Sequence, residues 1–232
     1  MKMINMFFSI FLLSSCSFNK TNNVDLKEYF WKISDYETPK ILIYNYDSVG
    51  TISSNYYLIK KISDNELSLT RFDKDFNEIQ YLKDLYKPDG VYLTETSFVE
   101  DIKTKLITKS IITSGFIFPF NDFNTKANVE TTFDLQLKND INIVNKDSWS
   151  FEEVVDKNIN GVNISTLVAK GLTERIITEK STGQKNTFKV KLESWYSKGI
   201  GITMMKQETP IGIFTDTYVK TITIEEFNKM KK

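Results

Sequence analysis

The stretch INGVNISTLVAKGLTERII, residues 159–177, contains the turn that decides the fold class. Asn160-Gly161 is the strongest short-range signal of a β-hairpin, because both residues tolerate the positive φ angles of a tight two-residue turn. The residues after it are rich in β-branched side chains, which favour strands. The stretch therefore predicts two antiparallel strands joined by a tight turn.

The same strand pattern extends outward along the chain in both directions. Apolar and polar side chains alternate in residues 187–196, where Phe188, Val190, Leu192 and Ser194 would share one side. Further segments with strand character are 40–46, 55–62, 66–72, 91–99, 103–112, 129–137, 199–209 and 211–224. About 10–12 strands at this spacing predict an all-β fold, either an antiparallel curved sheet or a two-sheet sandwich.

Residues 77–87 are the ambiguous part of this pattern, since their apolar side chains could also line one face of a helix. Ile79, Tyr81 and Leu85 fit a strand with one lapse in the alternation. A tight-turn sequence, KPDG, follows at 87–90 and leads into another strand. We therefore expect a strand here.

The N-terminus has the layout of a bacterial export signal. Lys2 precedes an apolar run that ends at Leu13, and Ser14, Ser15 and Cys16 follow. Leu13-Ser14-Ser15-Cys16 resembles the lipobox of bacterial lipoproteins. The resemblance implies cleavage between Ser15 and Cys16 and a diacylglycerol on the Cys16 thiol, which as a thiolate is nucleophilic enough to take the lipid.

Cys16 is the only cysteine in the 232 residues, so no disulfide can form within the chain and the thiol is free for lipid. The alternative is an ordinary secretory signal with a chance cysteine. We expect a signal peptide at 1–15, a lipidated flexible tether at 16–24 and a single all-β domain at 25–232. Short helices at the two ends of the domain are indicated by Asp25 and by Thr223, each followed three residues later by a glutamate.

The lipobox resemblance places the protein in the bacterial cell envelope, anchored to a membrane by lipid on Cys16. Ser17 follows the cysteine, where an Asp would resemble the inner-membrane retention signal of enteric bacteria. No acidic run follows that would suggest surface export. We therefore expect the periplasmic face of the outer membrane.

Composition excludes several function classes. Lys and Arg total 30 and Asp and Glu total 30, so the chain lacks the basic excess typical of nucleic-acid binding. It contains no histidine, which removes Ser-His-Asp triads, Cys-His dyads and the usual zinc sites. The adjacent Glu152 and Glu153 would point to opposite faces of a strand. We expect no enzyme activity, no cofactor and no metal.

One acidic segment resembles a calcium loop. Asp73, Asp75, Asn77 and Asp84 occupy ligand positions of an EF-hand-like loop, but Glu78 stands where glycine is required and position 12 lacks its glutamate. We favour a polar β-turn.

The most apolar stretch of the mature chain is IITSGFIFPFNDF, residues 111–123. It could form an exposed lip that contacts acyl chains or a protein partner, or it could fold back on the core. We favour the second, because an exposed patch of that size promotes aggregation. The candidate lip residues are Phe116, Ile117, Phe118, Phe120 and Phe123.

Residues 193–209, ESWYSKGIGITMMKQET, resemble the Trp-Tyr-x-x-Gly-Ile-Gly hairpin of uncharacterised envelope β-sheet lipoproteins. That resemblance implies a curved antiparallel sheet, and some lipoprotein carriers of related fold hold acyl chains in its concavity. Gly199 and Gly201 indicate a bend or bulge. We interpret Trp195 as core or rim packing rather than a ligand platform.

Together these features predict a lipid-anchored, non-catalytic envelope lipoprotein that binds an apolar or lipid-like ligand. The alternative is a structural or assembly lipoprotein that binds an envelope protein partner. An enzyme that acts on envelope sugars or peptides with carboxylates alone is a third possibility, which would need two carboxylates converging in a cleft.

Overall fold

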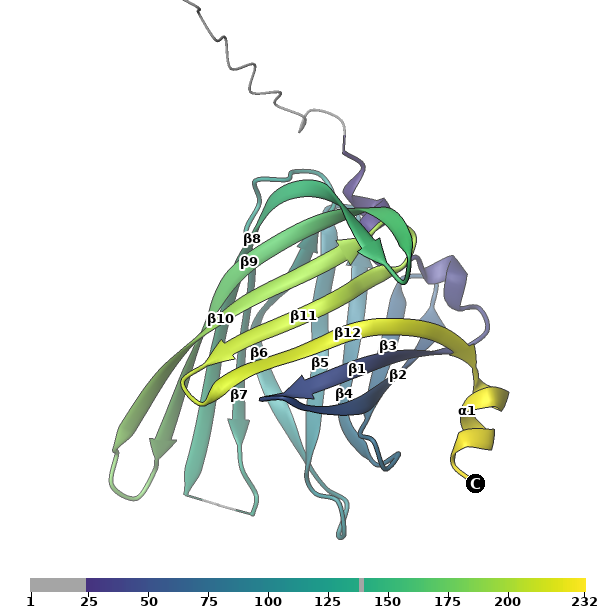
Figure 1. Ribbon diagram of the computed structural model, residues 1–232. Helices are drawn as coiled ribbons and strands as arrows, with labels where there is room; N and C mark the ends of the chain where they lie inside the picture. The colour runs from purple at the N-terminus through teal and green to yellow at the C-terminus, as the bar shows by residue number, and fades with distance from the viewer. Residues whose placement is uncertain (1–23, 138–139) are drawn as a thin grey trace, which may run out of the picture.

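The computed structural model describes residues 24–137 and 140–232, which form a closed barrel of twelve antiparallel strands (Figure 1). Consecutive strands are neighbours throughout, and β12 pairs with β1 to close the sheet. The strands are β1 (Lys40–Ser48), β2 (Thr51–Ser63), β3 (Glu66–Phe72), β4 (Glu78–Lys87), β5 (Gly90–Asp101), β6 (Leu106–Pro119), β7 (Ala127–Asp134), β8 (Ile141–Ile159), β9 (Val162–Glu179), β10 (Lys185–Ser197), β11 (Gly201–Thr209) and β12 (Gly212–Thr223).

The all-β class, the strand count and the short helices near the ends are confirmed, but the form of the sheet is not the one expected. Neither an open curved sheet nor a two-sheet sandwich is present, because β1 and β12 pair from Lys40 opposite Thr223 to Ser48 opposite Phe214. This closure joins the two ends of the described chain. Every strand therefore has a paired neighbour on both sides, and the β8–β9 hairpin extends beyond its neighbours, whose pairing ends at Trp149 and Thr166.

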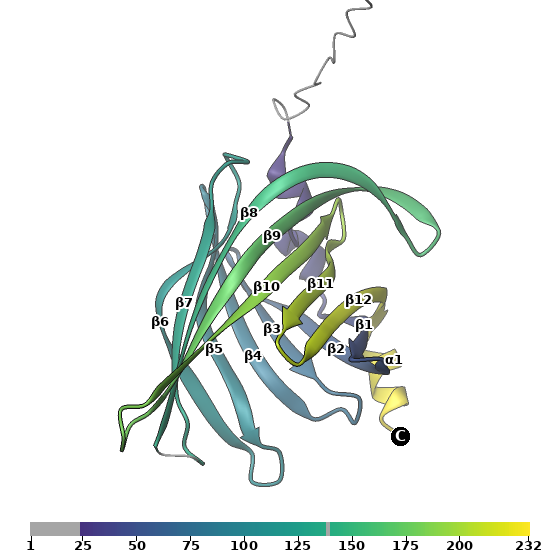
Figure 2. The ribbon, with the colours of Figure 1, turned by 60° about the vertical axis from the view of Figure 1, so that its left-hand side comes forward.

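The Asn160-Gly161 turn forms as predicted, with φ angles of 52° and 87°. It joins β8 and β9, which at 19 and 18 residues are the longest strands described. Their hairpin arches over one end of the barrel (Figure 2). The Asn160 side-chain amide donates a hydrogen bond to the Val219 carbonyl at 2.6 Å, which ties the tip of this hairpin to β12.

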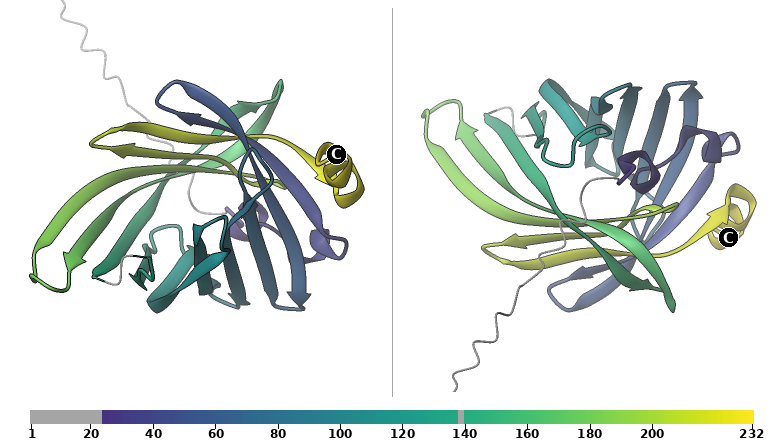
Figure 3. Two further views of the ribbon diagram at one scale, coloured as in Figure 1. Left: turned by 90° about the horizontal axis from the view of Figure 1, so that it is seen from below. Right: turned by 90° about the horizontal axis from the view of Figure 1, so that it is seen from above.

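The N-terminal segment, residues 24–36, covers the same end of the barrel, and we call it the plug. It contains two 3₁₀ helices, η1 (Leu26–Tyr29) and η2 (Ile33–Tyr36). Seen end-on in Figure 3, the first lies within the ring of strands and the second lies at its rim, beside β2. The Asp25 side chain accepts a hydrogen bond from the Lys27 amide. The Tyr29 hydroxyl bonds to the Ser165 hydroxyl of β9 at 2.9 Å.

The C-terminal helix α1 (Ile224–Met230) packs on the outside of the barrel (Figure 1). Its predicted capping box between Thr223 and Glu226 is present in full. Phe227 is 3% exposed and anchors the helix against Tyr56 and Phe72, with ring centroids 5.3 and 5.5 Å apart. No helix within residues 24–137 and 140–232 is both long enough and apolar enough to cross a membrane.

The strand expected at 77–87 is confirmed as β4, and the side chains that fitted the strand alternation do not line the interior. Leu82 and Asp84 line the inside of the barrel, so Ile79, Tyr81 and Leu85 alternate to its outer side. The lapse in the apolar alternation is Lys83, which lies on the same outer side. The strand expected at 129–137 ends earlier, at Asp134.

Candidate functional site

The interior of the barrel encloses a cavity of about 780 Å³, to which all twelve strands contribute side chains. Alternate residues of every strand point inward, so the lining is set by strand register rather than by loops. The cavity extends to the β11–β12 turn, where Ile211 is 80% exposed, and we call this end the mouth. A volume of this size lies within the range of about 300–1,000 Å³ that is typical of small-molecule sites.

The plug closes the opposite end of the cavity with aromatic side chains. Phe30 lies with its ring centroid 4.9 Å from Phe118 and 6.2 Å from Tyr196. Trp31 follows Phe30 and also lines the cavity. All four side chains are buried, so the plugged end is a closed apolar floor.

The Trp-Tyr-x-x-Gly-Ile-Gly hairpin supports this floor. A Cβ atom on Gly201 would lie 2.2 Å from Cδ1 and Nε1 of Trp31, and its φ angle is +92°. Only glycine fits this backbone with the Trp31 ring lying against it. Gly199 lies in the β10–β11 turn, and the register shift of this hairpin lies further along, between Trp195 and Tyr196, rather than at the two glycines. Tyr196 points into the cavity, and Trp195 faces outward, where its Nε1 donates to Glu193 at 2.8 Å.

Between floor and mouth the cavity wall is predominantly aliphatic. The side chains come from β3 to β5, β7, and β9 to β11, so they surround the cavity. They are Leu69, Leu82, Leu93, Val129, Ala169, Val190, Leu192, Ile202 and Met205. The four residues predicted to share one side of the strand at 187–196 do so, and that side lines the cavity. They are Phe188, Val190, Leu192 and Ser194.

Charged groups near the mouth are paired with one another. Arg71 Nη2 lies 3.7 Å from Asp216 Oδ2, and the Asn55 amide donates to Asp216 Oδ1 at 2.7 Å. The guanidinium also lies 5.6 Å from the ring centroids of Tyr46 and Tyr57. Burial raises the pKa of Asp216, and the neighbouring Arg71 partly offsets this effect.

A second polar group lies across the barrel in a side pocket of about 270 Å³. Arg175 Nε donates to Asn145 Oδ1 at 2.7 Å. Burial raises the pKa of Asp147, and a hydrogen bond from Thr173 and the charge of Arg175 act in the opposite direction. Both sides of the cavity near the mouth therefore hold opposite charges close together.

Asp84 differs from these carboxylates because it lies beside no cation. It is 3% exposed, and burial raises its pKa to about 7. On β3 and β5 its register partners are Leu67 and Leu93, both buried aliphatic residues. Leu67 is fully buried with the floor residues, so Asp84 lies toward the plugged end.

Of the predicted lip residues, only Ile117 lines the cavity. Phe118 is fully buried in the aromatic floor, and Phe120 and Phe123 pack against the same core. Phe116 packs against Tyr92, with ring centroids 5.1 Å apart. The segment thus lies against the core at the plugged end, and a contact of these residues with a ligand or partner stays a prediction.

The predicted cleavage and lipidation site, Ser15 and Cys16, lies outside the described residues. It stays a prediction from the sequence.

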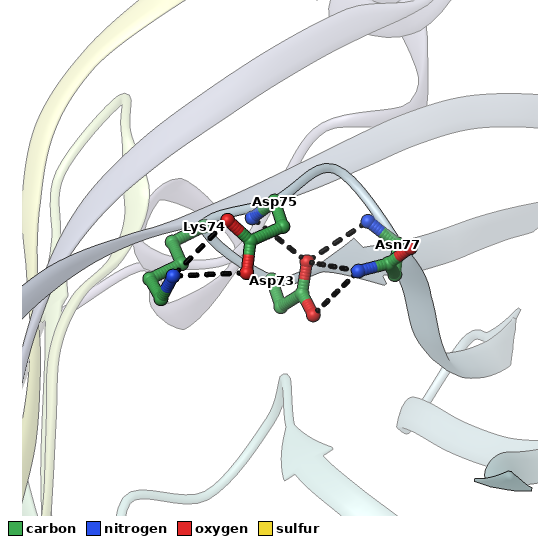
Figure 4. A network of polar contacts seen from close by, with 4 residues as sticks. All are labelled: Asp73, Lys74, Asp75 and Asn77. Carbon is green, nitrogen blue, oxygen red and sulfur yellow. Dashed lines mark hydrogen bonds and ion pairs between the residues drawn. The ribbon is translucent and has the colours of Figure 1, made fainter. Parts of the chain in front are cut away.

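The acidic segment that resembles a calcium loop forms the turn between β3 and β4 (Figure 4). Asp73 Oδ1 accepts hydrogen bonds from the amides of Asp75 and Asn77, each at 2.9 Å. Asp75 pairs with Lys74 at 2.9 Å, and Asp84 lies away from this turn on the cavity wall. The carboxylates are therefore engaged within the turn, and the described residues contain no group of three or more placed to hold a metal.

Sequence reasoning assigned no role to Asp84, Arg71 or Arg175 in a cavity. The available signal was the period-2 alternation of β4, which places Gln80, Leu82 and Asp84 on one face. That face appeared to be the solvent side because two of its three residues are polar. Polar residues that face inward can be distinguished from polar residues that face solvent only when the sheet is known to enclose a space.

Comparison with solved structures finds a similar fold in a protein described as a putative lipoprotein. The "putative lipoprotein" of Parabacteroides distasonis matches over 84% of this chain and 98% of its own, with a TM-score of 0.55 and 10% identity. The hypothetical lipoprotein YmcC of Escherichia coli covers 86% of this chain and 90% of its own, with a TM-score of 0.37 and 13% identity. No family model matches the chain, and no curated protein is similar to it in sequence.

Proposed function

We propose that this chain is a non-catalytic, lipid-anchored lipoprotein that binds an apolar or lipid-like ligand inside its barrel. The observation that carries the proposal is the aliphatic cavity of about 780 Å³, closed by the plug at one end and reaching the surface at the other. Protein interiors normally fill such space with side chains. A cavity whose wall is mainly apolar, with a few polar groups, favours a largely apolar occupant.

The anchor is proposed from the lipobox-like Leu13-Ser14-Ser15-Cys16, and the fold shared with a lipoprotein supports it. A thioether-linked diacylglycerol with an additional acyl chain would hold the protein firmly at a membrane, whereas a single chain binds reversibly. We place the protein at the periplasmic face of the outer membrane. Cys16→Ser is expected to leave an unprocessed or soluble product, and normal cleavage with retention in the membrane fraction would refute the anchor.

The proposal of a binding role rests on how the polar groups of the cavity are arranged. Its arginines near the mouth are engaged with Asp216 and Asn145. Asp84 has no second carboxylate placed as an acid or base partner on the adjacent strands, where Leu67 and Leu93 face it. We therefore propose binding without chemical conversion of the ligand.

A pair of substitutions on β10 tests whether the ligand occupies the cavity. Leu192 lines the cavity, and Lys189 is exposed on the opposite face of the same strand. Leu192→Trp is expected to weaken binding of a fluorescent fatty-acid probe by about tenfold or more, because the indole takes up part of the cavity. Lys189→Trp is the matched control and should leave binding unchanged. Equal effects of the two variants would place the probe outside the barrel.

A second candidate, a lipoprotein that binds an envelope protein, is favoured by one surface feature. Four aliphatic side chains at the neighbouring β1–β2 and β11–β12 hairpins are 49–80% exposed, and these are Val49, Ile52, Ile211 and Ile213. The hairpins are joined by a hydrogen bond from the Val49 amide to the Ile213 carbonyl at 3.3 Å. Ile52→Lys would abolish crosslinking to an envelope protein if this candidate holds, and would leave probe binding intact.

A further inference from the structure

We propose that the plugged end of the cavity binds an uncharged hydrogen-bonding group of the ligand, a hydroxyl or an amide, through Asp84 and the indole N–H groups of Trp31 and Trp149. This inference rests on the proposed function, because it assumes a ligand in the barrel. It assigns the direction of entry, with the polar group of the ligand at the closed end. The apolar part then lies along the aliphatic wall toward the mouth.

Asp84 is the first observation that carries this proposal. The carboxyl lines the cavity and is 3% exposed. Within the described residues, no hydrogen bond or ion pair stabilises its charged form, and burial alone sets its pKa. Buried carboxyl groups nearly always have partners, so an unpartnered one that faces a cavity indicates a missing ligand group.

Buried indole donors on the cavity wall are the second, independent observation. Trp31 Nε1 is buried and forms no hydrogen bond with the described residues. Trp149 Nε1 is also buried, and the Tyr196 hydroxyl lies beside it as a partner. Both side chains line the cavity together with Asp84. Burial raises the pKa of Tyr196, and the charge of Asp84 raises it further, so Asp84, Tyr196 and Trp149 lie in one neighbourhood. A buried donor left without an acceptor is costly, and a ligand oxygen would satisfy it.

These partners favour an uncharged ligand group over an ion. A hydroxyl or amide can donate to the Asp84 carboxyl and also accept from an indole N–H. An ammonium group could pair with ionised Asp84 but could accept nothing from Trp31 or Trp149. A carboxylate at the plugged end would be repelled by ionised Asp84. Arg71, whose Nε is buried without a partner among the described residues, and Arg175 lie near the mouth, away from Asp84.

The test measures binding of three amphiphiles with one chain length: 1-dodecanol, dodecylamine and dodecanoate. The proteins are residues 17–232, which contain the whole barrel, and the variants Asp84→Leu and Asp84→Asn. Asp147→Asn is the matched control for a carboxyl near the mouth, since Asp147 also lines the cavity. Displacement of a cavity-bound fluorescent probe gives each dissociation constant, and circular dichroism verifies that each variant is folded.

Wild-type protein is expected to bind dodecanol more tightly than either ion. Asp84→Leu should weaken dodecanol binding by about tenfold, whereas Asp84→Asn, which still donates and accepts, should retain most of it. Asp147→Asn should weaken dodecanol binding less than Asp84→Leu does, because Asp147 lies at the other end of the cavity. If dodecylamine binds more tightly than dodecanol and Asp84→Asn loses that binding, the site takes a cation and the inference is overturned. If only Asp147→Asn weakens dodecanol binding, the polar group of the ligand lies at the mouth, which also overturns the inference. Failure of all three amphiphiles to bind wild-type protein would refute the proposed function itself.

Discussion

Gly201 shows how a single residue holds the closed end of the cavity together. A methyl group at this position would meet the Trp31 ring at 2.2 Å, and the φ angle of +92° already disfavours any other residue. Gly201→Ala is therefore expected to destabilise the protein by about 2–4 kcal/mol, measured by denaturant unfolding. Gly199 is the matched control, because its φ is +76° but nothing lies within 4 Å of a Cβ. Gly199→Ala should cost about 1 kcal/mol, and equal losses would show that Trp31 does not depend on Gly201.

Asp84 makes stability depend on pH in a direction opposite to that of a carboxylate in a salt bridge. Its pKa rises from 3.8 to about 7 on folding, so the unfolded chain loses this proton first as the pH increases. The contribution is fully present below about pH 4 and is lost as the pH rises through about 7. By linkage this amounts to about 4 kcal/mol.

Asp84→Asn is expected to flatten that part of the pH profile. The titratable side chains whose pKa values Asp84 raises are Tyr86 and Tyr196, and neither ionises in this pH window. Burial also raises the pKa values of Asp147 and Asp216, so some slope should remain in the variant. The measurement is the free energy of unfolding of both proteins from about pH 4 to 8. Identical slopes of this free energy against pH would show that Asp84 is solvated.

Local signals in the sequence were sufficient where one turn or cap decides the structure. Asn160-Gly161 and the Thr223–Glu226 box formed as predicted, because their hydrogen bonds lie within a few residues. The inward face of β4 was not predictable in the same way. Gln80 and Asp84 are polar, and only the closed sheet turns them away from solvent.

At the scale of elements, the plug and α1 bury similar aromatic side chains on opposite sides of the same sheet. Phe30 packs in the cavity floor, and Phe227 packs on the outer surface. Either Phe→Ala change is expected to cost about 3–5 kcal/mol of stability, measured by denaturant unfolding. Only Phe30→Ala should also weaken probe binding, because it opens the floor. Equal probe affinity in the two variants would contradict a cavity closed by the plug.

The strands were predictable from alternation, whereas their closure was not. Residues 40–46 and 211–224 each have strand character, but nothing in either stretch indicates that they pair with each other. The role of the plug was hidden for a similar reason. Asp25 indicated a short helix, and the packing of Phe30 and Trp31 inside the ring depends on a barrel already formed.

For the molecule as a whole, the account joins an N-terminal anchor predicted from Cys16 to a barrel whose interior is not filled. The anchor would keep the protein at a membrane surface, where lipid-like molecules are concentrated. The cavity would remove an apolar molecule from water, with a gain of roughly 25 cal/mol for each Å² of apolar surface buried. Bound ligand should also raise the unfolding temperature, since it stabilises only the folded barrel.

Native mass spectrometry of the purified barrel tests the central claim most directly. Residues 17–232 would be expressed in a bacterial periplasm, where lipid-like molecules are available, and Leu192→Trp would be prepared in parallel. The account predicts an additional mass on the wild-type protein that organic solvent releases as an uncharged lipid bearing a hydroxyl or amide, and a reduced amount on Leu192→Trp. The contradicting result is a wild-type protein that carries no additional mass after purification and still carries none after incubation with a lipid extract.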